Sequence, residues 1–406
     1  MASKLLFTLI IPAFLGAFLF LGPTSQEVQR ELFSHLALGS DAGVIDCSGI
    51  PMSEFRGVVF IDNVLSNREQ GGTFHPPSDY VSESMRHIKL NGMNLVRVPI
   101  YWESYANNSA AFLNELEVVA RTAADNDICV IFDNHHWYTS SYWDIKKLGD
   151  AEGRGFPSFV VRDFPLVQSN DTYLSTAAPF WTAFLRNDIT VEGKKQIWDL
   201  QLEFFESVIA RVDGFDNVVG YEILNEPHIF SASQYDDLGK YHTYMAKGIR
   251  EVSDKKIFFD RETTRGFQRV PSLEYKIVPQ NVSGVVYTPH LYAAPFSGSQ
   301  AEVQVNNFKK WSEDWGGIEV LVGEWSASSQ DESDVYLESF RENGFGWTYY
   351  SWRPIESKGL GVSLYDTTWT TATEGLQQLT RSMGKTYSDI GGTSLVISPE
   401  HAEAAG

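Results

Sequence analysis

Hydrophobic and polar positions alternate along most of this chain in two rhythms, which predict strands and helices in turn. Short apolar runs bounded by turn-forming residues indicate buried strands. Such runs occur at 57–61, 94–99, 128–133, 217–224, 256–260, 284–288, 318–323 and 345–352. Segments with apolar side chains at helical spacing separate the runs, at 79–90, 110–124, 194–212, 234–252, 302–315, 331–343 and 371–383.

This alternation predicts the α/β class and a (β/α)8 TIM barrel. A doubly wound sheet is the alternative fold, but it rarely needs eight units, and no Gly-x-Gly-x-x-Gly follows the first strand run. The chain shows neither internal repeats nor a Pro/Ser-rich linker, so we expect one catalytic domain over residues 55–385. An N-terminal extension at 26–54 and a C-terminal tail at 386–406, with a weak strand at 394–398, would flank it.

One long segment, 137–190, departs from the rhythm because it is rich in aromatic residues and shows little periodicity. Loops of this length are usually functional or mobile. The segment follows the third strand run, so in a barrel it would lie on the face where active sites occur. We therefore expect it to form part of the wall of a cleft.

The N-terminus predicts an extracytoplasmic protein. Lys4 precedes an apolar stretch at 5–22, the order of an export signal. The stretch is nearly long enough to span a bilayer, so residues 1–25 fit either a cleaved signal peptide or a retained membrane anchor. The chain has two cysteines, Cys47 and Cys129. In an oxidising compartment they fit one disulfide or two buried free thiols, and the sequence leaves both open.

Charge and aromatic content restrict the partners. The formal net charge of −20 argues against nucleic acid and against an anionic membrane surface as a ligand. Aromatic residues make up 14% of the chain, which suits a cleft that stacks against sugar rings, although most of them must fill the core. We expect a monomer.

Two carboxylates occupy unusual places for a charge. Glu226 follows the fourth strand run and Glu324 ends the seventh. Burial of an unpaired charge costs several kcal/mol, so each must be paired or take part in chemistry. Strand exits of a parallel barrel carry the active site, and two carboxylates beside one pocket are what glycoside hydrolysis requires.

Polar and aromatic side chains gather at the other strand exits as well. They include Arg97, Asp133, Asn134, His135, His136, Asn225, Asp260, His290, Tyr292, Trp352 and Arg353. For any one of them an ordinary structural role is the better reading, but their joint placement at successive strand ends favours a site. The chain has no Cys/His cluster with metal-ligand spacing, so we expect neither metal nor cofactor.

These residues resemble glycoside hydrolase family 5 of the large clan of retaining barrels. The motifs are Leu95-Val-Arg-Val-Pro99, Asp133-x-His135, Leu224-Asn-Glu-Pro227, His290-x-Tyr292, Gly323-Glu324 and the strand of Trp352, and the likeness covers roughly residues 55–385. Family members often read Trp-Ser-Trp in strand eight. Here Tyr350-Ser-Trp352 stands instead, and Trp347 is a third candidate for the aromatic platform.

The resemblance implies a role for each matching residue. Glu226 would be the general acid/base and Glu324 the nucleophile, with carboxyl groups about 5–5.5 Å apart, as in retaining enzymes. Asn225 would bind the sugar 2-hydroxyl. The remaining substrate-binding residues would be Arg97, His135 or its neighbour His136, His290, Tyr292 and Trp352.

The resemblance also implies a β-linked oligo- or polysaccharide as substrate, cleaved internally in the manner of a cellulase or endo-β-1,4-glucanase. A mannanase is one alternative. An exo-β-glucosidase or a glycolipid-cleaving enzyme is another, and a membrane tether through residues 5–22 would favour either of these two. A carbohydrate-binding pseudoenzyme would have lost one carboxylate, yet both glutamates are present. A barrel amidohydrolase would need metal ligands at several strand ends.

Overall fold

The computed structural model describes residues 45–60, 80–136, 139–140, 142, 155–164, 173–191, 193, 195–261, 277–292, 298–327, 329–352 and 374–384. The chain divides into the units Met1–Asp41 and Ala42–Gly406, and all described residues belong to the second. The predicted signal or anchor segment and the weak strand at 394–398 lie outside the described residues.

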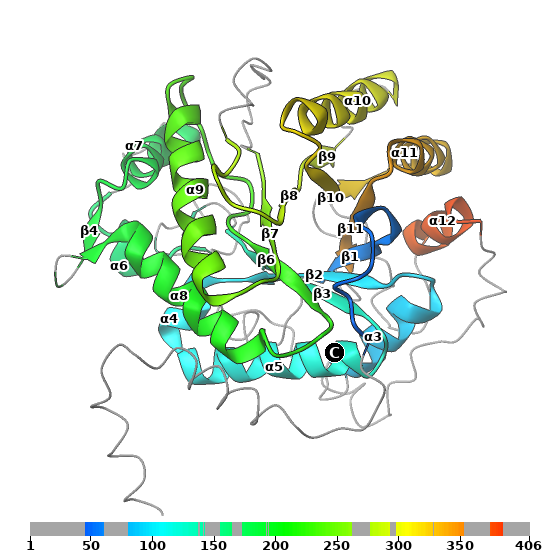
Figure 1. Ribbon diagram of the computed structural model, residues 1–406, viewed down its shortest axis with the longest axis horizontal. Coiled ribbons are helices and arrows are strands. Elements are labelled where there is room, and N and C mark those ends of the chain that lie inside the picture. Colours follow the sequence, from blue (N-terminus) through cyan, green and yellow to red (C-terminus); the bar gives the residue numbers. More distant parts are fainter. Residues whose placement is uncertain are drawn as a thin grey trace, which may run out of the picture. The chain divides into compact units, whose positions relative to one another are not determined.

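A closed parallel sheet forms the centre of the fold (Figure 1). Its order is β11-β1-β2-β3-β6-β7-β8-β10-β9, and β11 also pairs with β10, which closes the barrel. The strands are β1 (Arg56–Phe60), β2 (Leu95–Ile100), β3 (Cys129–Asn134), β6 (Val218–Glu222), β7 (Lys256–Phe259), β8 (Val285–Tyr287), β9 (His290–Tyr292), β10 (Glu319–Ser326) and β11 (Gly346–Trp352). The predicted (β/α)8 barrel is therefore confirmed.

Strands β8 and β9 are two halves of one barrel strand, separated by Thr288 and Pro289. The first half of β10 pairs with β8 through Glu319 and Val320, and its second half pairs with β9, which places Glu324 opposite His290. Proline has no N–H for a ladder, which agrees with the interruption at this point.

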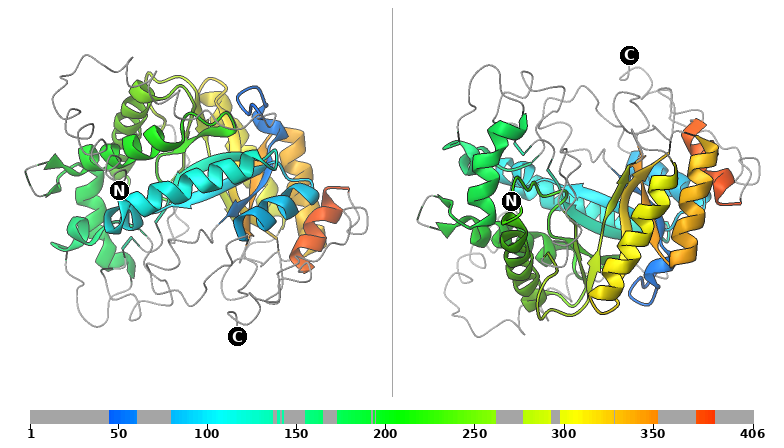
Figure 2. Two further views of the ribbon diagram at one scale, coloured as in Figure 1. Left: turned by 90° about the horizontal axis from the view of Figure 1, so that it is seen from below. Right: turned by 90° about the horizontal axis from the view of Figure 1, so that it is seen from above.

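Helices surround the barrel. They are α3 (Tyr80–Leu90), α4 (Trp102–Asn107), α5 (Ser109–Ala124), α6 (Ser158–Val161), α7 (Tyr173–Leu185), α8 (Ile197–Val212), α9 (Gln234–Val252), α10 (Gly298–Asp314), α11 (Gln330–Asn343) and α12 (Glu374–Ser382). Figure 2 shows α10 and α11 lying side by side along the outside of the sheet, in agreement with their contacts. None of the helices in the described ranges is long and apolar enough to cross a membrane.

Helix α7 corrects the expectation that 137–190 lacks regular structure. It is apolar around most of its circumference, and Phe180, Trp181 and Phe184 are fully buried. Ala178, Pro179 and Ala183 on its less buried side are apolar as well, so its sequence shows no polar stripe with a 3.6-residue period. Periodicity alone therefore could not reveal it.

The barrel wall separates two core clusters. Along β2, Val96 and Val98 belong to the outer cluster under the helices, whereas Leu95 belongs to an inner cluster. Arg97 has the same parity as Leu95 and follows it toward the carboxyl end of the strand. The interior is thus apolar at the amino ends of the strands and becomes polar where the site begins.

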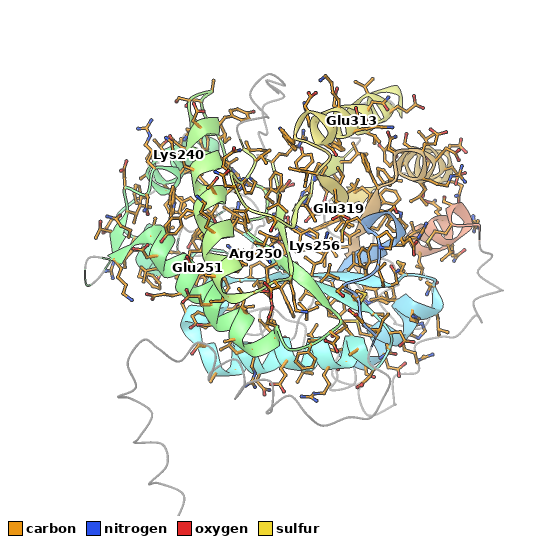
Figure 3. The ribbon with its side chains drawn as sticks, viewed as in Figure 1. Lys240, Arg250, Glu251, Lys256, Glu313 and Glu319 are labelled. Carbon is orange, nitrogen blue, oxygen red and sulfur yellow. A yellow bond between two sulfur atoms is a disulfide. The ribbon has the colours of Figure 1, made fainter. Side chains whose placement is uncertain are left out.

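The segment before β1 packs against the inner cluster. A disulfide joins Cys47 to Cys129, the first residue of β3, and Met52 and Phe55 are buried in the same cluster. Of the two states that the sequence left open for these cysteines, the structure has the disulfide. At the same end of the barrel, Lys256 of β7 forms an ion pair with Glu319 of β10 (Figure 3).

Candidate active site

Arg97 is the centre of the candidate site. Its Nε and Nη2 donate to the two carboxylate oxygens of Glu222 over 2.7 and 2.9 Å, and its Nη1 donates to Oε1 of Glu324 over 2.8 Å. Nη2 also donates to Oδ1 of Asn225 and lies 3.1 Å from Oδ2 of Asp133. The guanidinium is fully buried, so it fixes side chains from three further elements around a single cation.

Glu324 is held at both carboxylate oxygens. Arg97 donates to Oε1, and the hydroxyl of Tyr292 donates to Oε2. The strand pairing of β9 with β10 brings Tyr292 to this position. Both donors stabilise negative charge on Glu324. Burial raises the pKa of Tyr292 well above its usual value, and the neighbouring charge of Glu324 raises it further, so the hydroxyl stays a donor.

Glu226 lies on the segment that leaves β6 and has a positive φ of 42°. Its Oε1 is 2.8 Å from Nδ1 of His290, and its backbone N–H donates to Oδ2 of Asp260 over 3.0 Å. Oxygen atoms of Glu226 and Glu324 approach within 4.8 Å of each other, with His290 between them. The Glu226 side chain is 21% exposed and that of Glu324 is 4% exposed. The structure thus brings together the two carboxyls that the sequence singled out.

The two adjacent histidines that follow β3, His135 and His136, contact different partners. His135 lies 2.6 Å from Oδ2 of Asp133 through Nδ1 and packs edge-on against Tyr101. His136 instead donates from Nε2 to the backbone oxygen of Glu226 over 3.1 Å, and its ring packs on Trp181. His136 therefore supports the segment that carries Glu226, while His135 belongs to the network of Arg97.

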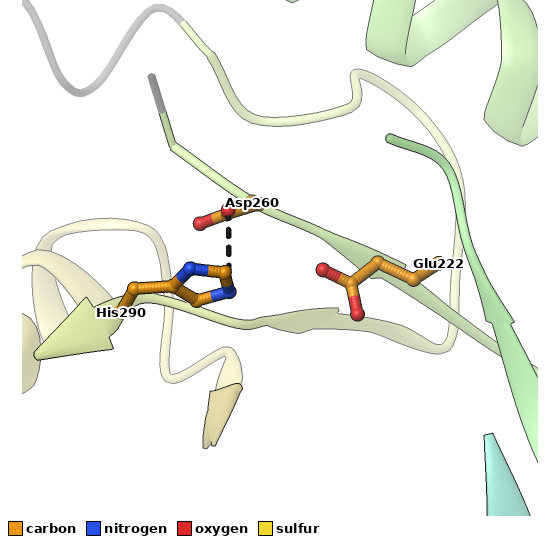
Figure 4. A group of neighbouring side chains, drawn as sticks. All are labelled: Glu222, Asp260 and His290. Carbon is orange, nitrogen blue, oxygen red and sulfur yellow. Dashed lines mark ion pairs between the residues drawn. The ribbon is translucent and has the colours of Figure 1, made fainter. Parts of the chain in front are cut away.

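Two acidic residues of the site received no role from the sequence. Glu222 is fully buried at the end of β6 and forms the bidentate pair with Arg97, and Thr288 donates to its Oε1 over 3.1 Å. Asp260 follows β7 and lies 3.5 Å from Nε2 of His290 (Figure 4). The available signal was a charge inside an apolar strand run, since such a residue must find a partner.

The network carries more acidic groups than cations. Burial raises the pKa of Asp133 to about 7, although Arg97 opposes this effect. Burial also raises the pKa of Asp260 well above its usual value, and the charges of Glu222 and Glu226 act in the same direction. Burial would lower the pKa of Arg97, but its carboxylate partners raise the value well above normal. Burial and the neighbouring negative charges thus favour the protonated forms of Asp133 and Asp260.

The site histidines are neutral at neutral pH. Burial lowers the pKa of His135 and of His290 to about 4 in each case, against the opposing charge of Glu324. A neutral imidazole has one N–H donor and one acceptor nitrogen, so each ring can join a donor on one side to an acceptor on the other.

The aromatic residues of strand eight differ in their surroundings. Trp352 is fully buried, and Trp347 packs against Trp325 in the outer core cluster. Tyr350 instead packs edge-on against Tyr292, with ring centroids 6.2 Å apart. Tyr350 therefore lies next to the residue that holds Glu324. A stacking role for Trp352 stays a prediction, and the indole would have to be uncovered to meet a sugar.

Two groups of side chains come close enough to bind a cation among the residues the structure describes. They are Glu222 with Asp260 and His290, and Glu226 with His290 and Glu324. In each group one carboxylate already pairs with Arg97, which supplies the positive charge that an ion would bring.

Comparison with known proteins identifies the family. The model of “Cellulase (glycosyl hydrolase family 5)” matches residues 66–356. A curated relative, an endoglycoceramidase from Cyanea nozakii, is 22% identical over 336 residues, which are 69% of this chain and 63% of that protein. The chain therefore spans less than two thirds of the length of this relative.

Solved structures share the fold. Endo-glycoceramidase II from Rhodococcus sp. matches with a TM-score of 0.66 at 19% identity and covers 84% of this chain and 80% of its own. An endogalactoceramidase matches with a TM-score of 0.61 at 15% identity, and the match covers 82% of this chain and 80% of that protein. A GH5-4 broad specificity endoglucanase from Clostridium acetobutylicum matches with a TM-score of 0.54 at 14% identity, and the match covers 83% of this chain and 100% of that protein. From the extent of the family match, the chain belongs to glycosyl hydrolase family 5.

Proposed function

We propose that the protein hydrolyses a β-glycosidic bond with retention of configuration, with Glu226 as acid/base and Glu324 as nucleophile. The separation of the two carboxyls is the observation that carries the proposal. Oxygen atoms of the pair lie within 4.8 Å, which suits direct attack on the sugar. An inverting pair stands about 6.5–9.5 Å apart to leave room for a water molecule.

The two surroundings support this division of roles. Glu324 accepts hydrogen bonds from Arg97 and Tyr292, one at each carboxylate oxygen, which hold it in place for attack as a nucleophile. Glu226 has a more exposed carboxyl and faces the neutral ring of His290. Such a site suits a group that gives a proton to the leaving oxygen and later takes one from water.

The reaction then has two steps. Glu324 attacks the anomeric carbon while Glu226 protonates the departing glycosidic oxygen, and a glycosyl ester forms on Glu324. Glu226, now ionised, removes a proton from water, which displaces Glu324 and releases the sugar. Asn225, fixed by Arg97, lies beside Glu226 in the chain and would bind the sugar 2-hydroxyl.

For the substrate we propose a glycolipid, with cleavage between the glycan and the lipid. The curated relative from Cyanea nozakii is an endoglycoceramidase, and two matching structures are a glycoceramidase and a galactoceramidase. Their TM-scores exceed that of the endoglucanase. Cleavage of a β-glucan is the second candidate. The predicted extracytoplasmic location and a tether through residues 5–22 would bring the enzyme close to lipid.

The test is glycan release from glycosylceramides in detergent micelles and from a panel of β-glucans, mannans and xylans. We expect intact oligosaccharide from the glycosylceramides, and no turnover by Glu324→Gln, which removes the nucleophile but little volume. Glu117→Gln, in a surface ion pair with Arg121, is the matched control and should keep full activity. Release only from a polymer would replace the glycolipid proposal, and turnover by Glu324→Gln would refute the assignment of the nucleophile.

A further inference from the structure

Asp260 contacts the proposed acid/base at two places. Its Oδ2 accepts the backbone N–H of Glu226 over 3.0 Å and lies 3.5 Å from Nε2 of His290. The other nitrogen of that ring, Nδ1, lies 2.8 Å from Oε1 of Glu226. One imidazole therefore stands between two carboxyl groups, as Figure 4 shows for the side of Asp260.

The ring of His290 is confined in this position. Gly323 precedes Glu324, and a Cβ atom built at Gly323 would lie 3.1 Å from Nε2 of His290 and 3.2 Å from its Cδ2. His290 itself is 6% exposed, and Asp260 is 1% exposed. A buried, confined imidazole keeps its two nitrogens directed at the same partners.

Charged and titratable groups of the neighbouring strands act on this arrangement. They are Arg97 of β2, His135 after β3, Glu222 of β6, Glu226 after β6 and Glu324 of β10. The backbone N–H of Arg261 also donates to Oδ1 of Asp260 over 2.7 Å. Arg97 already forms ion pairs with Glu222, Glu324 and Asp133. Glu226 and Asp260 face each other across the neutral ring of His290.

We propose that Asp260 is a positioning residue that shares a proton with Glu226 through the imidazole of His290. The inference rests on the proposed acid/base role of Glu226. In one arrangement Glu226 carries the acid proton, Nδ1 of His290 accepts from it, and Nε2–H faces the Asp260 carboxylate at 3.5 Å, within ion-pair distance but without a hydrogen bond. In the other, Asp260 carries the proton on the oxygen that faces Nε2, while Nδ1–H donates to the Glu226 carboxylate.

The two arrangements hold the same number of protons and the same charge. They interconvert when one proton moves between Glu226 and Nδ1 and another moves between Nε2 and Asp260. The second transfer requires Nε2 and Oδ2 to approach from 3.5 Å to hydrogen-bond distance, about 2.7–3.2 Å. After Glu226 has given its proton to the leaving group, the trio has lost one proton, and the attacking water restores it in the second step. No other reactant is needed, and the charge of the buried trio varies by one unit through the cycle.

This sharing has a consequence for the pH dependence. When two carboxyls share protons, the last proton belongs to the pair and is held more tightly than by either group alone, because its loss leaves two like charges together. Removal of the Asp260 carboxyl should therefore lower the pKa of the acid proton on Glu226. We expect the basic limb of the kcat/KM profile to move to lower pH in Asp260→Asn.

The experiment measures kcat/KM from pH 4.5 to 8.5 for wild type, Asp260→Asn and Asp260→Glu on two aryl β-lactosides. A phenyl leaving group needs protonation by Glu226, and a dinitrophenyl leaving group does not. For Asp260→Asn on the phenyl substrate we expect the basic limb to fall by about one pH unit, which is about a tenfold loss above it. This loss in kcat/KM should become smaller as the pH falls toward 5. Dinitrophenyl lactoside should be cleaved within about threefold of the wild-type rate, which also shows that the variant is folded.

Controls separate the inference from the proposed function. In Asp260→Glu the basic limb of the kcat/KM profile should move part of the way back toward its wild-type pH. Asp213→Asn should leave the profile unchanged, because Asp213 precedes β6 and accepts hydrogen bonds from Tyr221 and Ser253, away from the trio. An equal loss for Asp260→Asn at every pH and on both substrates would overturn the inference. Glu226→Gln must show the same preference for the dinitrophenyl substrate; if it shows none, the acid role of Glu226 fails as well.

Discussion

Arg97 donates from Nη1 to Oε1 of Glu324 over 2.8 Å, although the two residues are 227 positions apart in the chain. Nε and Nη2 of the same guanidinium donate to the carboxylate of Glu222. Closure of the barrel is what brings β2 and β10 to one site, so the position of the proposed nucleophile depends on the fold as a whole.

Arg97→Lys should therefore damage both stability and catalysis. Lysine keeps the charge but lacks the planar fork, so it cannot hold Glu222, Glu324 and Asn225 together. We expect a loss of about 1–3 kcal/mol in unfolding free energy, because a buried partner is left unpaired. We also expect at least about a tenfold loss in kcat. Urea unfolding and steady-state kinetics give the two values.

The matched control is Arg121→Lys, in an exposed pair with Glu117. Pairs of that kind contribute about 0–1 kcal/mol, so its stability and activity should stay close to wild type. Equal behaviour of the two variants would contradict the central role of Arg97.

Gly323→Ala should reduce activity more than stability. The added methyl group would meet the ring of His290 and the backbone oxygen of Thr288 at 3.1–3.2 Å, which forces the ring to move. Because that ring contacts Glu226, we expect kcat to fall by about tenfold or more, since small misplacements at a reacting centre are costly. Gly49→Ala, where a Cβ meets no atom within 4 Å, should match wild type in both measurements.

Loss of the disulfide should lower stability without changing the chemistry of the site. The bond between Cys47 and Cys129 closes a loop with a sequence separation of 82, so we expect its removal to cost about 2–5 kcal/mol. Cys129 begins β3, whereas Asp133 of the Arg97 network lies near the end of that strand. Below the melting temperature, Cys47→Ser/Cys129→Ser should therefore keep the wild-type kcat. A changed kcat in folded protein would show coupling between the two ends of the barrel.

His242 should make stability depend on pH. It is fully buried in α9, its Nδ1 donates to the backbone oxygen of Ile277, and burial lowers its pKa to about 4. The unfolded chain binds a proton near pH 6.5 and the folded chain does not, so stability is complete above pH 6.5 and is lost as the pH falls toward 4. We expect a loss of about 2 kcal/mol from this residue between pH 7 and pH 5.

The comparison variant is His242→Asn, whose amide nitrogen can replace Nδ1 as the donor but does not titrate. Its unfolding free energy should change less than that of wild type over the same interval, whatever its absolute stability. An identical change in both proteins would assign the pH dependence to other groups.

The sequence predicted the barrel well because each strand and helix is a local pattern. Predicted and observed ends agree within a few residues, from β1 through β11, since apolar runs and turn residues mark them. The missed helix α7 has apolar residues on its less buried side as well, and the split of one strand into β8 and β9 coincides with one proline. A search for periodicity detects neither feature.

The sequence by itself also predicted the family, which the comparisons confirm, and singled out Glu226 and Glu324, because each follows an apolar run where a charge is costly; their catalytic roles stay a prediction. Only the tertiary structure decided which groups share a charge or a proton. Glu222 pairs with Arg97 and Asp260 meets His290 because non-adjacent strands converge inside a closed barrel. For the same reason Tyr350 packs against Tyr292 beside the site, whereas Trp352 belongs to the outer core cluster. Such contacts depend on distances across the barrel, which a linear pattern does not contain.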